Sequence, residues 1–174
     1  MALRKAIAYR FHEKPYTRKS RKRRKNYIRT IPGNKIVKFH MGNIKRKFSI
    51  RLSLICNEKI QMRDNSIEAA RITINRHLED RLGRNNFYFS VRVYPHHILR
   101  ENKMLTGAGA DRMQSGMKKS FGKPMGRAAQ MNIGDEIFEV GVNNSGLALA
   151  KDAFRKVKAK LPCTTSVLLK RIGG

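Results

Sequence analysis

The sequence predicts an α+β fold that forms a single domain. Short stretches in which apolar and polar residues alternate are typical of half-buried β-strands, and two longer stretches repeat apolar residues at helical spacing. The two kinds of segment follow one another irregularly, as they do in α+β domains. Because there is neither an internal repeat nor a linker, we expect residues 1–174 to form one domain.

The chain begins with a strongly basic segment, which we predict to be an RNA-binding arm over residues 1–35. Residues 1–51 hold 18 Lys and Arg residues and one acidic residue, Glu13. From Tyr9 to Gly33 no apolar period is sustained, so this stretch cannot bury enough surface to fold alone. A solvated charge run and a localisation signal are the alternatives. The candidate RNA-binding cations of the arm are Arg18, Lys19, Arg21, Lys22, Arg23, Arg24, Lys25 and Arg29.

Aromatic residues also occur along this arm. Each could stack on an unpaired base or ribose, or it could pack against the folded domain. The four residues concerned are Tyr9, Phe11, Tyr16 and Tyr27.

The core, residues 36–174, is expected to begin with a strand and a helix. Apolar residues occupy every second position over 48–56, which predicts a half-buried strand. Apolar residues then recur at helical spacing, which predicts an amphipathic helix over 65–82. Residues suited to its ends flank it: Asp64 or Asn65 as a cap, Glu68 in a capping box, and Gly83 at the stop.

A second alternating segment, 87–93, predicts a strand that stops at Pro95, because proline has no amide to donate. Alternation returns at 127–133 and 136–142, with Gly134-Asp135 between them. We interpret that pair as a β-hairpin.

The last elements are a second helix and a final strand. Helical periodicity extends over 147–161, with Ala150 and Phe154 on the inward stripe, and Pro162 ends it. Alternating Thr165, Val167 and Leu169 predict the final strand.

The net charge of the chain limits the class of partner that it can bind. The formal net charge is +27 and the sequence pI is near 11, so a polyanion is needed to relieve repulsion, and nucleic acid is the first candidate. A membrane surface is the alternative, but the sequence shows no lipidation signal or amphipathic anchor.

We expect a reducing, cytoplasmic location, because the beginning of the chain has no apolar run typical of a signal peptide and Cys56 and Cys163 lie far apart. Both thiols are then expected to be small, partly buried hydrophobes.

Residues 95–125 are predicted to be a long glycine-rich loop. Glycine lets backbone approach RNA closely, and cations neutralise phosphates; a disordered surface loop is the alternative. The cations distributed along this loop are Arg100, Lys103, Arg112, Lys118, Lys119 and Lys123.

None of the motifs in this loop predicts catalysis. Residues 106–112 match neither of the glycine-rich nucleotide-binding patterns. One of His96 and His97 is expected in the core and the other on RNA, without a metal, and sequence does not distinguish them. Glu101 and Asp111 are interpreted as ion-pair partners of neighbouring arginines. We therefore predict no enzyme, no cofactor and no metal.

Four motifs in the loop and the strand before it carry a resemblance to a known family. They are Arg92-Val93-Tyr94-Pro95-His96-His97-Ile98-Leu99-Arg100-Glu101-Asn102-Lys103-Met104, Gly107-Ala108-Gly109-Ala110-Asp111-Arg112, Gly116-Met117 and Phe121-Gly122-Lys123-Pro124. These motifs are similar to those of the archaeal and eukaryotic ribosomal protein family L-ten-e, the relatives of bacterial large-subunit L-sixteen, and the Tyr94-Pro95-His96-His97 motif looks more archaeal than eukaryotic. The resemblance covers nearly the whole chain.

The resemblance implies an α/β-hammerhead-like mixed sheet with two main helices, in addition to the basic arm and the glycine-rich loop. It implies a structural constituent of the large ribosomal subunit that binds its rRNA, with Lys118, Lys119 and Lys123 joining the arm in RNA contact. A free-standing basic RNA chaperone or chromatin protein and an RNA-modifying enzyme are the alternatives.

The resemblance also implies that part of the loop reaches toward the tRNA corridor and the peptidyl transferase centre. Partners would then be rRNA, neighbouring ribosomal proteins and tRNA, without a membrane and without homo-oligomers. The residues expected near tRNA are Glu101, Asn102, Lys103, Met104, Leu105, Thr106, Gly107, Ala108, Gly109, Ala110, Asp111 and Arg112.

Overall fold

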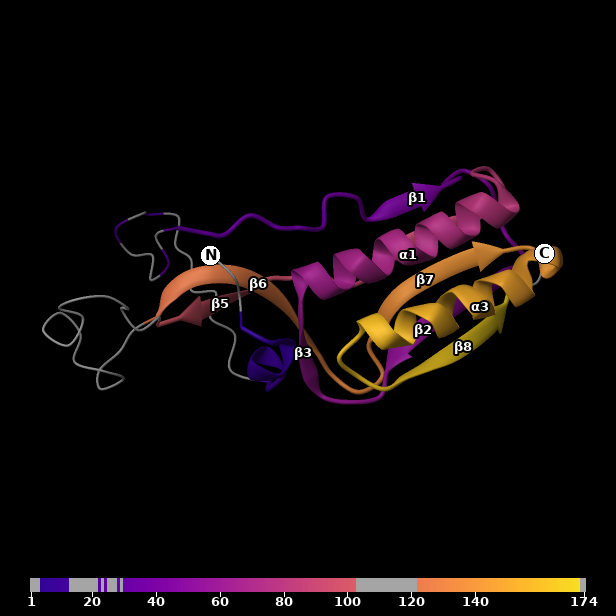
Figure 1. Cartoon of the computed structure of the whole chain (residues 1–174). Helices are drawn as coiled ribbons and strands as arrows, with labels where there is room; N and C mark the ends of the chain where they lie inside the picture. The colour runs from indigo at the N-terminus through magenta and orange to yellow at the C-terminus, as the bar shows by residue number, and fades with distance from the viewer. Residues whose placement is uncertain are drawn as a thin grey trace, which may run out of the picture.

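The computed structural model of the chain describes residues 4–12, 22, 24, 28, 30–102 and 122–172. Within these residues the strands form two sheets, and the α+β class is confirmed (Figure 1). The larger sheet has the order β1-β4-β7-β2-β8, and the smaller has the order β3-β6-β5. In chain order the strands are β1 (His40–Gly42), β2 (Ile50–Cys56), β3 (Ile60–Arg63), β4 (Tyr88–Val91), β5 (His97–Glu101), β6 (Lys123–Met131), β7 (Glu136–Val142) and β8 (Thr165–Arg171).

Every strand pair in these sheets is antiparallel. The described chain therefore has two antiparallel sheets where the family resemblance implied a mixed one. The predicted strands at 48–56, 136–142 and 165–169 are confirmed as β2, β7 and β8, and the strand at 87–93 is confirmed in a shorter form as β4.

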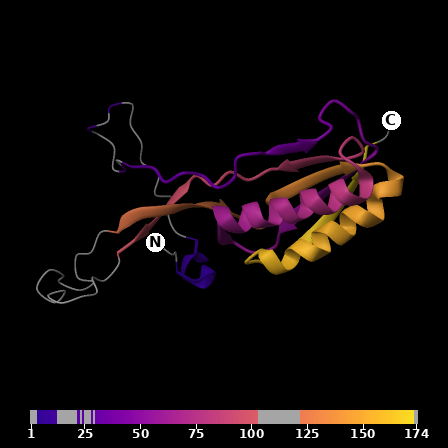
Figure 2. The same ribbon diagram turned by 45° about the horizontal axis from the view of Figure 1, so that its top comes forward.

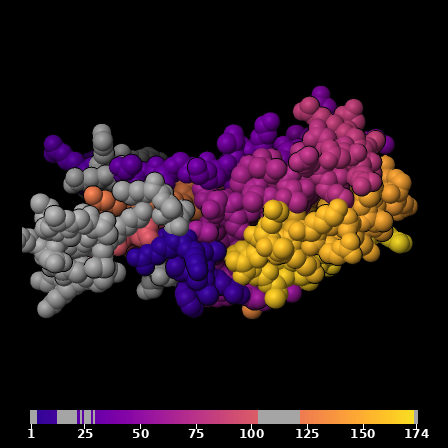
Figure 3. Space-filling view, in the orientation of Figure 1, coloured from indigo at the N-terminus to yellow at the C-terminus, as the bar shows by residue number. Residues whose placement is uncertain are grey.

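The helices α1 (Asp64–Leu82) and α3 (Leu147–Val157) cover one face of the five-stranded sheet (Figures 1 and 2). The helix predicted over 147–161 is shorter in the structure: a 3-10 turn, η4 (Lys158–Lys160), follows α3 directly, and Leu161 is already extended. Ile74 of α1, Phe154 of α3 and Leu52 of β2 are fully buried in one continuous core. In the space-filling view the two helices form a continuous layer over the sheet (Figure 3).

The ends of α1 agree only in part with the capping prediction. Gly83 ends the helix with φ 76°, and its N–H donates to the Glu79 carbonyl at 3.0 Å, as expected. The predicted capping box is wrong, because the residue before the helix, Arg63, makes no side-chain capping hydrogen bond. Glu68 instead forms an ion pair with Arg71 at 2.6 Å, one turn further along the same helix.

The predicted hairpin of residues 127–133 and 136–142 is also wrong. Its turn exists, with Gly134 at φ 92°, but β6 belongs to the small sheet and β7 to the large sheet. The Gly134 N–H donates to the Cys56 carbonyl at 2.8 Å, and the Cys56 N–H donates to the Asp135 carbonyl at 2.9 Å. These bonds fix the turn against the end of β2, so the chain passes from one sheet to the other.

Part of the predicted N-terminal arm is folded. Residues 6–9 form a 3-10 turn, and the Tyr9 side chain is buried against the small sheet. The backbone N–H of Gln61 in β3 donates to the Arg10 carbonyl at 2.9 Å, and the side-chain Nε2 of Gln61 donates to the Tyr9 carbonyl at 3.0 Å. Residues 4–12 are therefore an edge of the core and not an extended arm.

Candidate nucleic-acid interface

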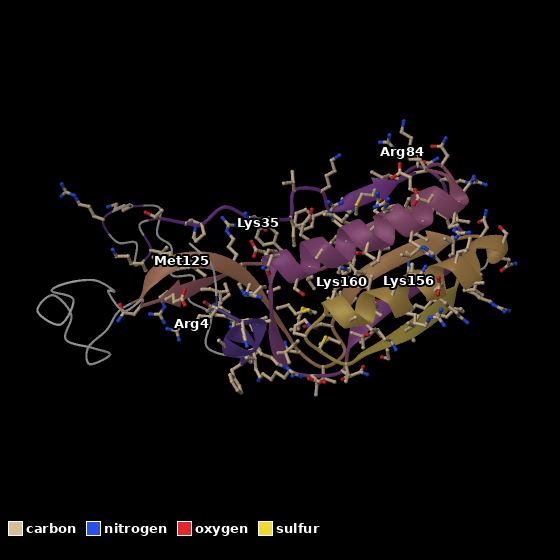
Figure 4. The ribbon with its side chains drawn as sticks, viewed as in Figure 1. Arg4, Lys35, Arg84, Met125, Lys156 and Lys160 are labelled. Atoms are coloured by element: carbon tan, nitrogen blue, oxygen red, sulfur yellow. The ribbon has the colours of Figure 1, made fainter. Side chains whose placement is uncertain are left out.

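The ends of the predicted loop 95–125 form a two-stranded base. Residues 97–101 are β5 and residue 123 begins β6, so strands occupy both ends of the segment that we expected to be loop. Glu101 and Lys123 are opposite each other in register. A Cβ atom built on Gly122 would lie 2.8 Å from the Glu101 nitrogen, so glycine is what allows the returning chain to come this close. Figure 4 shows Arg4 and Met125 at this same end of the molecule.

Glu101 does form an ion pair, but with a residue that the sequence did not indicate. Its Oε1 lies 2.7 Å from Nε of Arg4, near the start of the chain, and its side chain is only 5% exposed. The Arg63 guanidinium donates to the Arg4 carbonyl at 2.9 Å and so holds that segment in place. The ion pair fastens the folded N-terminal segment to the end of β5.

The two adjacent histidines have different environments. His97 is 3% exposed, whereas His96 is exposed. Burial lowers the pKa of His97 to about 4, and the nearby His96, Arg100 and His12 lower it further by repulsion. His97 is therefore a neutral core residue at physiological pH, and His96 is the one available to a partner.

The structure describes only some of the predicted contact residues. Lys22, Arg24 and Lys123 are exposed to solvent, while Glu101 and Asn102 lie at the end of β5. The other predicted residues lie outside the described part of the chain: Arg18, Lys19, Arg21, Arg23, Lys25, Arg29, Lys118, Lys119, and Lys103, Met104, Leu105, Thr106, Gly107, Ala108, Gly109, Ala110, Asp111 and Arg112.

A second basic surface lies on the five-stranded sheet, on the face that α1 and α3 do not cover. Arg51 of β2 is opposite Lys170 of β8 in register, and both are exposed. Arg92 projects to the same face, where its Nε lies 3.5 Å from Glu139. Glu139 is buried and also forms an ion pair with Arg51 at 2.7 Å. We call this the open sheet face.

Sequence reasoning missed the open sheet face. Lys47 and Tyr88 line a shallow cavity there together with Arg51 and Glu139. Arg51, Tyr88 and Glu139 come from strands that are distant in sequence, and the pairing of β7 with both β2 and β4 brings them together. Cations at the polar positions of an alternating strand are the only sequence signal, and that signal is typical of any solvated face.

The two cysteines are far apart in sequence but neighbours in the structure. Burial, and next the neighbouring Cys56, raise the pKa of the Cys163 thiol to about 12. Cys56 is buried, and its Sγ donates to the Glu58 carbonyl at 3.0 Å. Among the described residues, no group of three His, Cys, Asp or Glu side chains is placed to hold a metal ion. Nor is any helix among them long and apolar enough to span a bilayer.

Comparison with known proteins gives a consistent picture. Residues 15–168 match the family model described as ribosomal protein L16p/L10e. The chain is 45% identical over 149 residues to the large ribosomal subunit protein uL16 of Methanosphaerula palustris, covering 86% of each chain. The proteins of the same name from Archaeoglobus fulgidus and Staphylothermus marinus are 40% and 43% identical over 171 residues, or 98% of this chain and 95% of theirs.

Proposed function

The chain belongs to the ribosomal protein L16p/L10e family, and from this premise we propose that it is a structural constituent of the large ribosomal subunit. In this role it binds large-subunit rRNA, contacts neighbouring ribosomal proteins and performs no reaction of its own. It assembles in the cytoplasm as one copy of a single domain. The observation that carries the proposal is a family match over residues 15–168 in a chain with a net charge of +27.

The positions of the exposed cations support RNA binding. Lys22, Arg24 and Lys123 belong to the basic segments that we predicted to contact RNA, and all three are exposed. The open sheet face adds Arg51 and Lys170 on another side of the molecule. Cations that are separated in this way can neutralise phosphates of more than one RNA segment, and a ribosomal protein that stabilises folded RNA has to do this.

We propose that residues 101–112 extend toward the tRNA corridor and the peptidyl transferase centre. The support is the family resemblance together with the shape of the loop base. The pairing of β5 with β6 and the ion pair of Glu101 with Arg4 fix the point at which the loop begins. A rigid base lets a loop reach a defined place while the rest of the domain stays on its RNA.

Cosedimentation tests the assignment to the ribosome. The protein is expected to sediment with large subunits and to stay bound until the salt concentration is high, because phosphate contacts weaken as salt rises. Free protein at low salt would contradict the proposal. The double variant Lys22→Gln/Arg24→Gln should lower the salt dependence of RNA binding by up to about 0.9 per lost duplex phosphate contact.

Deletion tests the role of the loop. Removing residues 103–110 leaves β5 and β6 intact, so the shortened protein is expected to fold and to join large subunits. Translation by those subunits should be impaired, since the segment proposed to lie near tRNA is gone. Normal translation by subunits that carry the shortened protein would argue against the proposed position, and failure to fold would argue against a loop that is independent of the core.

A further inference from the structure

A cavity lies between the folded N-terminal segment and β5, at the base of the loop. Its volume is about 340 Å³, at the lower end of the range of about 300–1,000 Å³ that is typical of ligand pockets. Arg4, Tyr9 and Phe11 line one side, while residues 97–102 line the other. We call it the loop-base pocket.

One buried polar atom in this pocket has no partner. The Glu101 Oε1 atom is held by Arg4, but Oε2 is buried and accepts no hydrogen bond from the part of the chain that the structure describes. Leaving a buried acceptor unsatisfied costs free energy, and the cost is larger for a charged group. Because Glu101 lines the pocket, a ligand there that donated to Oε2 would remove this cost.

The other pocket residues indicate what kind of molecule would supply that donor. Arg4 and Arg100 bring positive charge to the rim, which favours a ligand that also carries an anionic group. Phe11 lines the same pocket with 76% of its surface exposed, which makes its ring available for stacking. A nucleotide combines a phosphate, a flat ring and amino donors in one unit.

We propose that the loop-base pocket holds one unpaired nucleobase of the bound RNA, whose amino group donates to Glu101 Oε2 while its ring stacks on Phe11. The proposal rests on the proposed function, since it assumes an RNA partner. A carboxylate oxygen only accepts, so adenine, cytosine and guanine all fit through their exocyclic amino groups. Uracil has no amino group, and the carbonyl oxygens beside its N–H would face the carboxylate.

The neighbouring side chains of the pocket do not satisfy Oε2 themselves. Gln61 also lines the pocket, but its Nε2 donates to the Tyr9 carbonyl and its Oε1 accepts from Gln130 at 3.1 Å. The Tyr9 hydroxyl accepts from the Arg4 N–H at 3.3 Å. Among the side chains just compared, Glu101 is the one that keeps an acceptor without a partner, at Oε2, and we expect it to determine which bases are preferred.

Short single-stranded oligo(C), oligo(A) and oligo(U), titrated against the full chain at one moderate salt concentration, test the proposal. The unchanged protein is expected to bind oligo(C) and oligo(A) at least about 10-fold more tightly than oligo(U), the scale of one hydrogen bond to a charged group. In Glu101→Gln, Arg4 holds the amide oxygen, so the NH2 group takes the place of Oε2 and donates. The preference should then disappear or shift toward oligo(U).

Two further variants complete the experiment. Glu79→Gln makes the same charge change on the exposed side of α1 and should keep the preference for oligo(C) and oligo(A). Phe11→Leu alters an exposed residue, so folding is not at risk, and it should weaken binding of all three oligomers by about 5-fold or more through lost stacking.

The possible results separate the two proposals. If the unchanged protein binds the three oligomers equally, or if Glu101→Gln keeps the preference, the pocket proposal is overturned while rRNA binding stands. If Phe11→Leu binds as the unchanged protein does, the stacking half of the proposal is overturned. If the chain binds no RNA in a salt-dependent way, it is the proposed function that fails.

Discussion

Arg4 and Glu101 form an ion pair of 2.7 Å that joins the beginning of the folded chain to the end of β5. The Arg4 side chain is 57% exposed, whereas the Glu101 side chain is 5% exposed, so the partners are not equivalent. An ion pair that is exposed on both sides contributes only about 0–1 kcal/mol to stability. The larger effect of losing Arg4 would come from leaving the buried carboxylate without its charged donor. The pair therefore matters chiefly because Arg4 supplies a charged donor to the buried Glu101 carboxylate.

Replacing Arg4 should destabilise the domain. In Arg4→Gln the Glu101 carboxylate loses its charged donor, and we expect the free energy of unfolding to fall by about 1–3 kcal/mol. Urea unfolding monitored by circular dichroism measures this change. Arg4→Lys, which keeps the charge, should recover part of the loss. An unchanged midpoint in Arg4→Gln would show that the pair contributes nothing.

The buried His97 predicts a dependence of stability on pH. Its folded pKa is about 4 and its unfolded pKa is near 6.5, so between these values the unfolded chain binds a proton that the folded chain does not. The contribution is present in full above about pH 6.5, falls as the pH is lowered, and is gone below about pH 4. The loss amounts to at most about 3 kcal/mol.

Matched variants isolate this effect from the titration of carboxylates. In His97→Gln the fall in unfolding free energy between pH 6.5 and 4 should be smaller than in the unchanged protein, even though the variant is less stable overall. His96→Gln, at the exposed neighbour, should keep the original pH profile. Equal profiles for all three proteins, measured by urea unfolding at several pH values, would contradict the assignment of a neutral buried His97.

Sequence patterns predicted the elements whose causes are local. The expected helix 65–82 is α1, Asp64–Leu82, because its apolar period and the glycine after it lie within one segment. The alternation over 48–56 likewise predicted β2. These features depend on neighbouring residues, and neighbouring residues are what a sequence displays directly.

The features that the sequence did not predict depend on contacts between distant segments. The pairing of β6 with β3 and β5 could not be inferred from a turn that looks like a hairpin. The His97–Glu101 strand has consecutive buried residues, Ile98 and Leu99, and so lacks the alternation that marks a strand. The partner of Glu101 is 97 positions away, although Arg100 is adjacent in sequence. At the site, composition predicted the kind of partner, and only the register of the strands placed the cations of the open sheet face together.

Gly42 is expected to tolerate no side chain. Its φ is 77°, and a Cβ atom there would lie 2.2 Å from the Phe87 carbonyl oxygen, which already accepts from the Asn43 N–H. Gly42→Ala should lower the free energy of unfolding by more than the roughly 1–3 kcal/mol expected for strain in this region alone. Gly134→Ala is the control, since it has φ 92° but no atom within 4 Å of the added carbon. Equal losses in urea unfolding would show that the contact with Phe87 is relieved by a shift of the chain.

The open sheet face should contribute to RNA binding, and a charge-matched pair of variants measures how much. The double variant Lys47→Gln/Lys170→Gln removes two exposed cations of this face. Arg51 is left unchanged because it forms an ion pair with the buried Glu139. The logarithm of the binding constant for a large-subunit rRNA fragment should depend less steeply on the logarithm of the salt concentration, by up to about 1.8 for two duplex phosphate contacts.

The control removes the same charge from the opposite side of the domain. Lys151 and Lys158 are exposed on α3 and on the turn that follows it, so Lys151→Gln/Lys158→Gln changes the net charge equally without touching the open sheet face. If binding responds to net charge alone, the two double variants will lose affinity to the same extent. A larger loss of affinity from the sheet variant means that RNA lies on that face. A cation that contacts a phosphate contributes directly to binding, whereas the attraction of a distant cation is largely screened by salt. A larger loss from the helix variant would place the RNA over α3 instead.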